Sequence, residues 1–414
     1  MFMQDQPFKY AVGLDVGTAS VKCVVGHIEE GSAIPTIVGV GAHPNHGMRK
    51  GVVVDMVNTA QAIDKALEAA ERASGYRIDA ATLNINGSHI TGMASRGVVA
   101  VGPAGHEIVS EDLARAEEAA TVVQLPPNRE ILEVTPQGYQ LDGQEKIKDP
   151  LGMVGVRLEV DAYVITALTP YVKNLRRACE ITQLSPRRLV VPSLAAARAV
   201  LGEQLAENGA IIIDIGGSTI NLAVYDEGDL QHVAVLPVGS ANITNDLAIG
   251  LKTDIDVAEA VKLQYSAKAS SKITVQVGDK KHVFDGEEVE DIVSARLEEI
   301  FETVNGELKK IGRVAKLPGG AVLCGGGAAL SGIAEFAKNQ LLLPARLGRL
   351  PAMSGLSDQV SSPEYVTALG LMLLDLESVQ STSADAHSGA IKTPLLAINQ
   401  LSSKLGKVFK KFKV

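Results

Sequence analysis

The sequence predicts an α/β protein with two lobes that share a cleft. The first observation is a repeated pattern: residues 10–22 read YAVGLDVGTASVK and residues 211–221 read IIIDIGGSTIN. In each, apolar residues lead to an Asp and a Gly, hydroxyl residues follow, and apolar alternation returns, which is typical of a strand, a glycine turn and a second strand. The second observation is a composition poor in aromatic residues, at 4% of 414 residues, and rich in Ala, Val, Leu and Gly. That length suggests about two or three domains.

The two repeats have the chemistry of a phosphate site. Glycine lets backbone N–H groups approach a phosphate, and nearby hydroxyls add donors, here those of Thr18, Ser20, Ser218 and Thr219. Asp15 and Asp214 stand at matching positions before the two turns. Mg²⁺ keeps several waters and takes only one or two carboxylates, so this pair suits a hydrated magnesium ion. Two such turns facing each other predict a site for a nucleoside triphosphate.

A third glycine turn lies at residues 321–328, which read AVLCGGGA. It follows an apolar strand, and its backbone would approach the ribose and α-phosphate of a nucleotide. An ordinary turn of an α/β fold is the alternative. Neither GxxxxGK[ST] nor a GxGxxG that opens a helix after a strand occurs, which disfavours P-loop and dinucleotide-binding folds.

The other elements follow from hydrophobic periodicity and turn residues. A helix is expected over 59–74, closed by Gly75. The block from 82 to 168 predicts a self-contained α+β insertion. The remaining expectations are helices over 170–183 and 193–207, a hairpin over 210–236, a helix from 256, a short hairpin over 272–284 turning at Gly278 and Asp279, and a long charged helix from Glu287.

Charge and cysteine usage exclude several classes of protein. The net charge of −9 disfavours a nucleic-acid-binding body. Cys23, Cys179 and Cys324 stand in apolar surroundings at spacings that do not suit zinc, so buried thiols in a reducing compartment are expected. Residues 1–9 lack the pattern of a signal peptide, and no apolar run reaches the length of a membrane-spanning helix, so a cytosolic origin is expected.

The C-terminal segment differs from the acidic body. Residues 377–393 are rich in Ser, Ala, Thr, Asp and Gly, which predicts a flexible linker. On a helical wheel of residues 394–414, one side carries Ile398, Leu401, Leu405, Val408, Phe409 and Phe412. The other side carries Lys404, Lys407, Lys410 and Lys411. Such a helix suits the surface of an anionic membrane, the alternatives being a helix docked on the body or a basic partner-binding peptide.

The order of these motifs resembles the actin/Hsp70/sugar-kinase superfamily, and within it the FtsA family of bacterial cell-division proteins. The wider resemblance rests on DVGTASVK at 15–22, DIGGST at 214–219, LAAA at 194–197, LCGGGA at 323–328 and ALGLML at 368–373. The narrower one rests on GVG at 39–41, GMRKG at 47–51 and, above all, PQGYQLDGQEKIKDPLGMVGVRLE at 136–159 within the insertion.

The resemblance implies ATP and Mg²⁺ in the cleft of an actin-like fold. It makes Asp15 and Asp214 the catalytic acids on the Mg²⁺ side. It places Gly17, Thr18, Ala19 and Lys22 in the first phosphate turn, Gly216, Gly217, Ser218 and Thr219 in the second, and Gly326 and Gly327 beside the adenosine. Glu259 and Lys262 resemble a pair that flanks ribose and adenine, although a solvated helix face is the alternative for them.

The same resemblance implies a domain organisation. The first-lobe core takes 1–82 and 166–192 with 361–376, and the inserted α+β interaction subdomain takes 83–165. The second-lobe core takes 193–227 and 311–360, with an outer subdomain at 228–310. A linker at 377–393 and a membrane-targeting helix at 394–414 complete the chain.

The implied function is a cytoskeletal adaptor that forms filaments and tethers the FtsZ ring to the inner face of the cytoplasmic membrane. Its partners would be the FtsZ C-terminal peptide, bound on the outer second lobe, other division proteins through 83–165, and anionic lipids through 394–414. Hydrolysis of ATP would be slow at most, because Pro192 stands where hydrolytic relatives carry a water-positioning acid or Gln. A pilus-assembly scaffold of the same fold and a sugar or acetate kinase are the alternatives.

Overall fold

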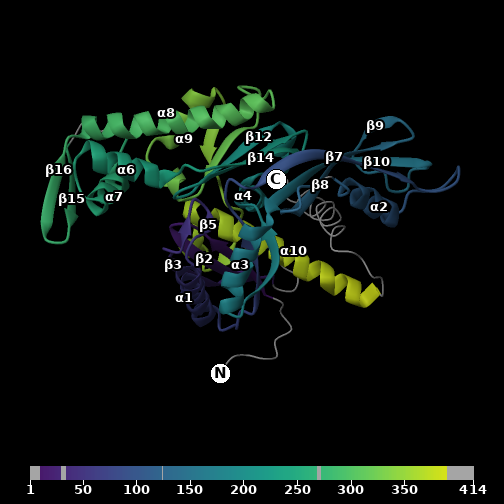
Figure 1. The fold of residues 1–414 in the computed structure, drawn as a ribbon, viewed down its shortest axis with the longest axis horizontal. Helices are drawn as coiled ribbons and strands as arrows, with labels where there is room; N and C mark the ends of the chain where they lie inside the picture. Colours follow the sequence, from purple (N-terminus) through teal and green to yellow (C-terminus); the bar gives the residue numbers. More distant parts are fainter. Residues whose placement is uncertain (1–9, 29–33, 124, 268–271, 389–414) are drawn as a thin grey trace, which may run out of the picture.

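The computed structural model describes residues 10–28, 34–123, 125–267 and 272–388. The predicted amphipathic helix at 394–414, with all its membrane-facing residues, lies outside these residues. Within them, the helices are too short or too polar to cross a membrane. The predicted two-lobed α/β architecture with an inserted subdomain is confirmed (Figure 1).

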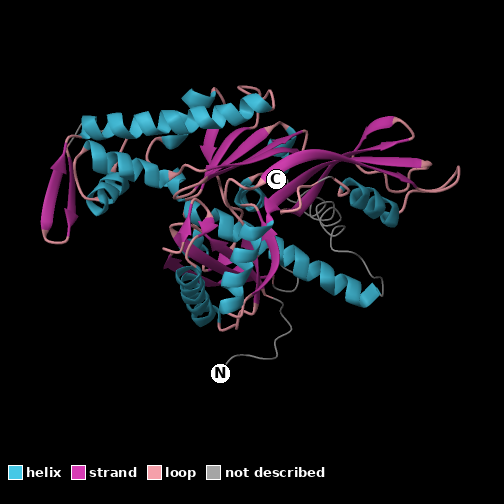
Figure 2. Ribbon diagram, viewed as in Figure 1, coloured by secondary structure: helices cyan, strands magenta, loops and turns pink. Residues whose placement is uncertain are grey.

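The first lobe is built on a sheet with the strand order β11-β6-β1-β2-β3-β19. Its strands are β1 (Ala11–Val16), β2 (Ser20–His27), β3 (Thr36–Pro44), β6 (Ala80–Asn84), β11 (Ser185–Val190) and β19 (Ser354–Gly355). Helices α1 (Met56–Ser74), α3 (Thr169–Ile181) and α10 (Val366–Ser388) pack on this lobe (Figure 2). Gly75 ends α1 as predicted, because its φ of 76° lets its N–H bond Glu71 O. A short ribbon of β4 (Met48–Arg49) and β5 (Val52–Val53) precedes α1.

The second lobe is built on a sheet with the order β14-β13-β12-β17-β18. Its strands are β12 (Ala210–Ile215), β13 (Ile220–Asp226), β14 (Asp229–Leu236), β17 (Gly320–Cys324) and β18 (Ala345–Leu347). The helices of this lobe are α4 (Pro192–Val200), α5 (Glu203–Glu207), α6 (Ser240–Gly250), α7 (Ile255–Gln264), α8 (Gly286–Lys310) and α9 (Ile333–Leu341). The hairpin of β15 (Ile273–Val277) and β16 (Lys280–Phe284) turns at Gly278 and Asp279 as predicted, and extends beyond α7 (Figure 1).

The insertion forms its own sheet with the order β7-β10-β8-β9 and helix α2 (Ser110–Ala120) on one face. The strands are β7 (Thr91–Ala100), β8 (Arg129–Leu141), β9 (Gln144–Ile147) and β10 (Arg157–Leu168). Leu158, Val160 and Ala162 are fully buried beneath α2 in a separate apolar core. The predicted α+β character of this block is therefore correct, and Figure 2 shows it at the end of the molecule opposite the β15–β16 hairpin.

Several predicted boundaries differ from the structure. The helix expected over 193–207 is two helices, because Leu201 and Gly202 have extended backbone. The segment 210–236 is a three-stranded meander, so β14 lies in the second-lobe sheet and not in the outer subdomain at 228–310. Strand β19 pairs with β3, so the end of 311–360 belongs to the first lobe.

The linker predicted at 377–393 is also wrong in part. Helix α10 continues to Ser388, since nothing in 377–388 interrupts helical hydrogen bonding and none of these residues is Pro or Gly. Helix α6 was not expected, because its apolar residues are spread around the helix and show no clear helical period.

Helices α10 and α4 form the junction between the lobes, and glycine allows their close approach. A Cβ on Gly370 would lie 1.8 Å from Ala195 O, and a Cβ on Gly13 would lie 2.1 Å from Ala368 O. The backbones therefore touch directly, which no larger residue permits. Cys23, Cys179 and Cys324 are all buried free thiols, as predicted.

The junction predicts opposite effects of one substitution at two helical glycines. Gly370→Ala should destabilise the protein by about 1–3 kcal/mol, because the added methyl group has no room. Gly306→Ala is the matched control in α8, where a Cβ meets no atom within 4 Å. It should stabilise by about 0.5–1 kcal/mol by favouring helix. Thermal unfolding followed by circular dichroism measures both, and equal midpoints for the two variants would contradict the packing argument.

Candidate functional site

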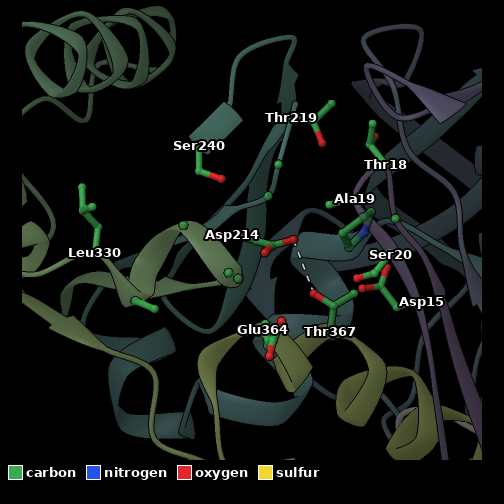
Figure 3. A pocket seen from close by; sticks show the side chains of 18 of the residues that line it. Asp15, Thr18, Ala19, Ser20, Asp214, Thr219, Ser240, Leu330, Glu364 and Thr367 are labelled. Atoms are coloured by element: carbon green, nitrogen blue, oxygen red, sulfur yellow. Dashed lines mark hydrogen bonds between the residues drawn. The ribbon is translucent and has the colours of Figure 1, made fainter. Parts of the chain in front are cut away.

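A cleft of about 420 Å³ lies between the two lobes, and all three glycine turns of the sequence line it (Figure 3). This volume falls in the range of about 300–1,000 Å³ that is usual for ligand sites. The lining residues from the predicted set are Asp15, Gly17, Thr18, Ala19, Ser20, Lys22, Pro192, Asp214, Gly216, Gly217, Thr219, Glu259, Lys262, Gly325, Gly326 and Gly327. The structure therefore brings together segments that are far apart in the sequence.

The first two turns have the same geometry. In β1–β2, Gly17 N donates to Ser20 O at 3.1 Å, and in β12–β13, Gly216 N donates to Thr219 O at 2.9 Å. The strand register is also the same, since Asp15 pairs with Lys22 and Asp214 pairs with Asn221. The two predicted hairpins are thus structural repeats of each other.

The tips of the two turns meet across the cleft. A Cβ on Gly217 would lie 3.3 Å from the Cβ of Ala19. A hydrogen bond from a residue outside the hairpin fixes each turn. Asn45 Nδ2 donates to Gly17 O at 2.8 Å, and Ala241 N donates to Gly217 O at 2.7 Å. The turns are therefore positioned before any ligand arrives.

The two aspartates lie inside the cleft between these turns (Figure 3). Burial raises the pKa of Asp15 to about 6, although nearby Lys22 opposes the shift. Burial and the negative charge of Asp15 raise the pKa of Asp214 to about 7. Asp15 accepts from Asn84 Nδ2 at 2.7 Å, and Thr367 Oγ1 lies 3.4 Å from Asp214 Oδ2. Two buried carboxylates with raised pKa values mark a place where a cation would replace lost solvation.

Lys22 supplies positive charge beneath the first turn. Its Nζ donates to Ser20 Oγ at 2.8 Å and lies 3.5 Å from Glu364 Oε2, and its side chain is 11% exposed. Glu364 precedes α10, in a 3-10 turn (Pro363–Tyr365) that packs on the turn Gly326–Ala329. The lysine therefore connects the first phosphate turn with the third glycine turn.

Glu259 and Lys262 lie on α7 at the cleft, so the alternative of a solvated helix face is wrong for Lys262, whose side chain is 11% exposed. Lys262 Nζ donates to Glu259 Oε2 at 2.7 Å and to Thr244 Oγ1 at 2.9 Å. Thr244 in turn donates to Glu259. This triad fixes both charged side chains at one wall of the cleft.

The third turn approaches Asp214 so closely that it requires glycine. Gly325 has a φ of 81°, and a Cβ there would lie 2.3 Å from Asp214 Oδ1. Gly326 and Gly327 line the cleft, as predicted. The backbone of this turn therefore forms a wall of the cavity next to the carboxylates.

Ser218 differs from Thr219 in its place at the site. It is not among the described residues that line the cleft, and its Oγ is buried with no hydrogen-bond partner among them. Thr219, the next residue, does line the cavity. Sequence pattern alone does not say which of two adjacent hydroxyls faces the cleft.

Other lining residues were missed by sequence reasoning. They include Asn84, Asn86, Ser240, Ile243, Tyr265, Leu330, Glu364 and Thr367. Each belongs to an element outside the three glycine turns, and tertiary folding alone brings it to the cavity. Within the described ranges, no group of three or more His, Cys, Asp and Glu side chains forms a candidate metal centre, so Asp15 and Asp214 stand as a pair.

Comparisons with known proteins agree with this geometry. A family model described as "Cell division protein FtsA" matches residues 211–370, and one described as "SHS2 domain inserted in FTSA" matches residues 87–166. The chain is 34% identical to the cell division protein FtsA of Pseudomonas aeruginosa, over 93% of this chain and 94% of the relative. It is 38% identical to that of Bacillus subtilis, over 87% of this chain and 82% of the relative. It is 31% identical to that of Escherichia coli K12, over 97% of this chain and 98% of the relative.

Solved structures of lower identity show the same fold. A chain of a "PilM-PilN type IV pilus biogenesis complex" superposes with a TM-score of 0.65 at 20% identity, covering 88% of this chain and 98% of its own length. MreB 5 of Spiroplasma citri bound to AMPPNP superposes with a TM-score of 0.53 at 14% identity, covering 93% of this chain and 100% of its own length. The fold is therefore shared with a pilus-assembly protein, whereas the sequence relatives are division proteins. With its inserted subdomain and its actin-like cleft, this chain belongs to the FtsA family of cell division proteins.

Proposed function

We propose that this protein binds ATP with Mg²⁺ in the cleft, forms filaments, and tethers the FtsZ ring to the inner face of the cytoplasmic membrane at the division site. The observation that carries the nucleotide proposal is the meeting of two equivalent glycine turns, with Gly217 against Ala19. Backbone N–H groups and the hydroxyls of Thr18 and Thr219 would hold the phosphates from both sides. Glu259, Lys262 and the Gly326–Gly327 backbone would hold the nucleoside.

Magnesium fits the acidic side of the cleft. Asp15 and Asp214 are both buried carboxylates: burial raises the pKa of each, and the charge of Asp15 raises the pKa of Asp214 further. A divalent cation would offset the cost of ionising them, and Mg²⁺ needs no more than one or two protein carboxylates when phosphates and water complete its shell. The ion would supply charge neutralisation at the phosphates.

Turnover would be slow at most. Pro192, at the first turn of α4, lines the cleft, and its side chain has no group that could orient a water molecule. General-base assistance typically contributes about 10²–10⁴-fold in rate. Nucleotide occupancy, more than hydrolysis, would then control the state of the protein.

The remaining contacts are assigned to separate parts of the chain. Residues 228–310 would receive the FtsZ C-terminal peptide, and 83–165 would contact other division proteins and neighbouring copies in a filament. Residues 394–414 would lie on anionic lipid, with apolar side chains at the acyl boundary and lysines at the headgroups. Each assignment follows from the family and from the sequence pattern.

The first test of this proposal concerns the second phosphate turn. Gly216→Asp places bulk and negative charge where the phosphates would lie, so isothermal titration should show loss of ATP binding. Gly278→Asp is the matched control at the β15–β16 turn, where φ is 59° and a Cβ has open space. Asp tolerates that conformation, and this variant should bind ATP normally. Normal binding by Gly216→Asp would remove the turn from the site.

The second test uses the raised pKa of Asp214. Because its folded pKa is about 7, above its usual value near 4, the stability that this carboxyl contributes without metal is present at low pH and is lost as pH rises through about 7. Asn cannot ionise. In EDTA, the stability of Asp214→Asn should therefore rise relative to that of the wild type as the pH increases from 5 to 8. Mg²⁺ should stabilise the wild type increasingly over the same range and stabilise the variant less, because only Asp15 then remains as a carboxylate ligand.

Thermal unfolding midpoints at each pH measure both effects. At pH 8 in EDTA, Asp214→Asn should be more stable than the wild type by at least about 1 kcal/mol, since one pKa unit is worth about 1.4 kcal/mol. A wild-type midpoint that responds to Mg²⁺ equally at pH 5 and pH 8 would contradict the assignment of this carboxylate to the metal.

The third test addresses the C-terminal helix. Phe409→Glu places a charge in the apolar side and should release the protein from liposomes containing anionic lipid, while ATP binding is unaffected. Ser403→Glu adds the same charge on the lysine side and should only weaken sedimentation. If Phe409→Glu and Ser403→Glu sediment alike with liposomes, the helix is not the membrane anchor.

A further inference from the structure

The cleft is linked to the insertion by a continuous chain of hydrogen bonds that starts at Asn86. We propose that Asn86 is a positioning residue that couples occupancy of the cleft to the base of the insertion, through His89 and Arg129. Ligand binding would tighten the roots of strands β7, β8 and β10. This inference rests on the proposed nucleotide binding, and it concerns a residue that contributes to neither phosphate turn.

The first link crosses between the lobes. Asn86 follows β6 of the first lobe, and its Nδ2 donates to Thr219 Oγ1 at 2.9 Å in the second phosphate turn. The Asn86 side chain is fixed from the other side, because its Oδ1 accepts from Gly87 N at 2.7 Å. Both Asn86 and Thr219 line the cleft.

The hydroxyl of Thr219 has the capacity for two roles at once. A hydroxyl accepts through its lone pairs while it donates its own proton. If Thr219 donates to a phosphate oxygen, the bond that it accepts from Asn86 becomes more polar and stronger, because hydrogen bonds in series reinforce each other. Ligand binding would therefore hold Asn86 more firmly than the empty cleft does.

The second link is a histidine clamped in one tautomer. His89 Nε2 lies 3.1 Å from Asn86 O, and Leu168 N lies 3.4 Å from His89 Nδ1. Since Leu168 N–H donates, Nδ1 is the acceptor and Nε2 carries the proton to Asn86 O. The ring also stacks on Tyr171 of α3, with centroids 4.4 Å apart. A shift of Asn86 is therefore transmitted to His89 and to the start of the insertion.

The third link gathers the strands of the insertion at their roots. Arg129, at the start of β8, donates from Nη2 to His89 O at 2.8 Å and to Thr91 Oγ1 at 2.6 Å. Its Nε donates to Thr166 Oγ1 at 3.0 Å, and Thr91 and Thr166 are paired between β7 and β10. One guanidinium thus joins His89 to all three long strands.

The insertion also contacts the second lobe directly, at edge strand β14. Tyr163 Oη accepts from Val233 N at 3.1 Å, and Gln137 Nε2 donates to Leu230 O at 2.6 Å. Further out, Lys148 Nζ lies 2.7 Å from Asp229 Oδ2. The insertion is attached covalently to one lobe and bonded to the other, so a change in the position of the lobes acts on it at two places.

Hydrogen exchange of the full chain, with and without saturating MgATP, tests the coupling. In the wild type, MgATP should slow exchange in 91–100 and 129–141 at the insertion base. Asn86→Ala should still bind MgATP, with affinity reduced roughly 5-fold or more, and should lose this protection. Asn305→Ala is the matched control, because Asn305 Nδ2 also makes one bond, to Gln340 O at 2.9 Å, away from the chain of contacts. It should behave as the wild type.

The reverse direction gives a second measurement. Arg129→Gln changes no residue that lines the cleft, and by reciprocity it should weaken MgATP binding by a similar factor. Unaltered exchange of the insertion in a wild type that binds MgATP would overturn the coupling and leave the proposed function intact. Retained protection in Asn86→Ala, or unchanged affinity in Arg129→Gln, would also overturn it. A wild type that does not bind MgATP would instead refute the proposed function itself.

Discussion

The close contact of α10 with β1 and α4 is the constraint on which the rest of the structure depends. Gly13 and Gly370 bring the backbones together at distances that exclude any Cβ. Asp375 of α10 adds a buried anchor, because it accepts from Val12 N at 2.9 Å and Thr82 Oγ1 at 2.7 Å and pairs with Arg187. Since α4 packs on β12 and β13, this junction sets the distance between the two phosphate turns. The cleft is therefore a consequence of backbone packing some way behind it.

The chemistry of the cleft follows from what that packing buries. Asp15 and Asp214 are carried into the interior at the ends of β1 and β12, where few positive charges reach them. Gly325 passes so close to Asp214 that solvent is excluded from that side. Such a pair is unfavourable to ionise in isolation, because burial removes the solvation of both carboxylates and the charge of Asp15 acts on Asp214. Lys22 offsets part of this charge and lies toward the first turn.

The insertion packs more closely against the two lobes than a domain joined only by a linker would. Tyr163 and Ile165 share one apolar core with Leu230 and Val233 of the second lobe. A Cβ on Gly92 would lie 2.1 Å from Tyr163 Oη, so the route of this side chain to β14 depends on glycine. The outer part of the insertion has its own hydrophobic core under α2. The base of the insertion therefore packs with the lobes, whereas its outer part packs around a core separate from theirs.

Local features of this protein were determined by the sequence itself. The two hairpin turns, the Gly75 helix end and the turn at Gly278 and Asp279 depend on residues within a few positions, so their patterns suffice for prediction. The order of glycine motifs pointed to the superfamily, and the sequence of the insertion at 136–159 pointed to the family. Tertiary structure alone decided that Asn84 and Asn86 enter the cleft and that β14 joins the second-lobe sheet beside the insertion. These outcomes depend on contacts between distant segments, where register and packing select among residues that are locally equivalent.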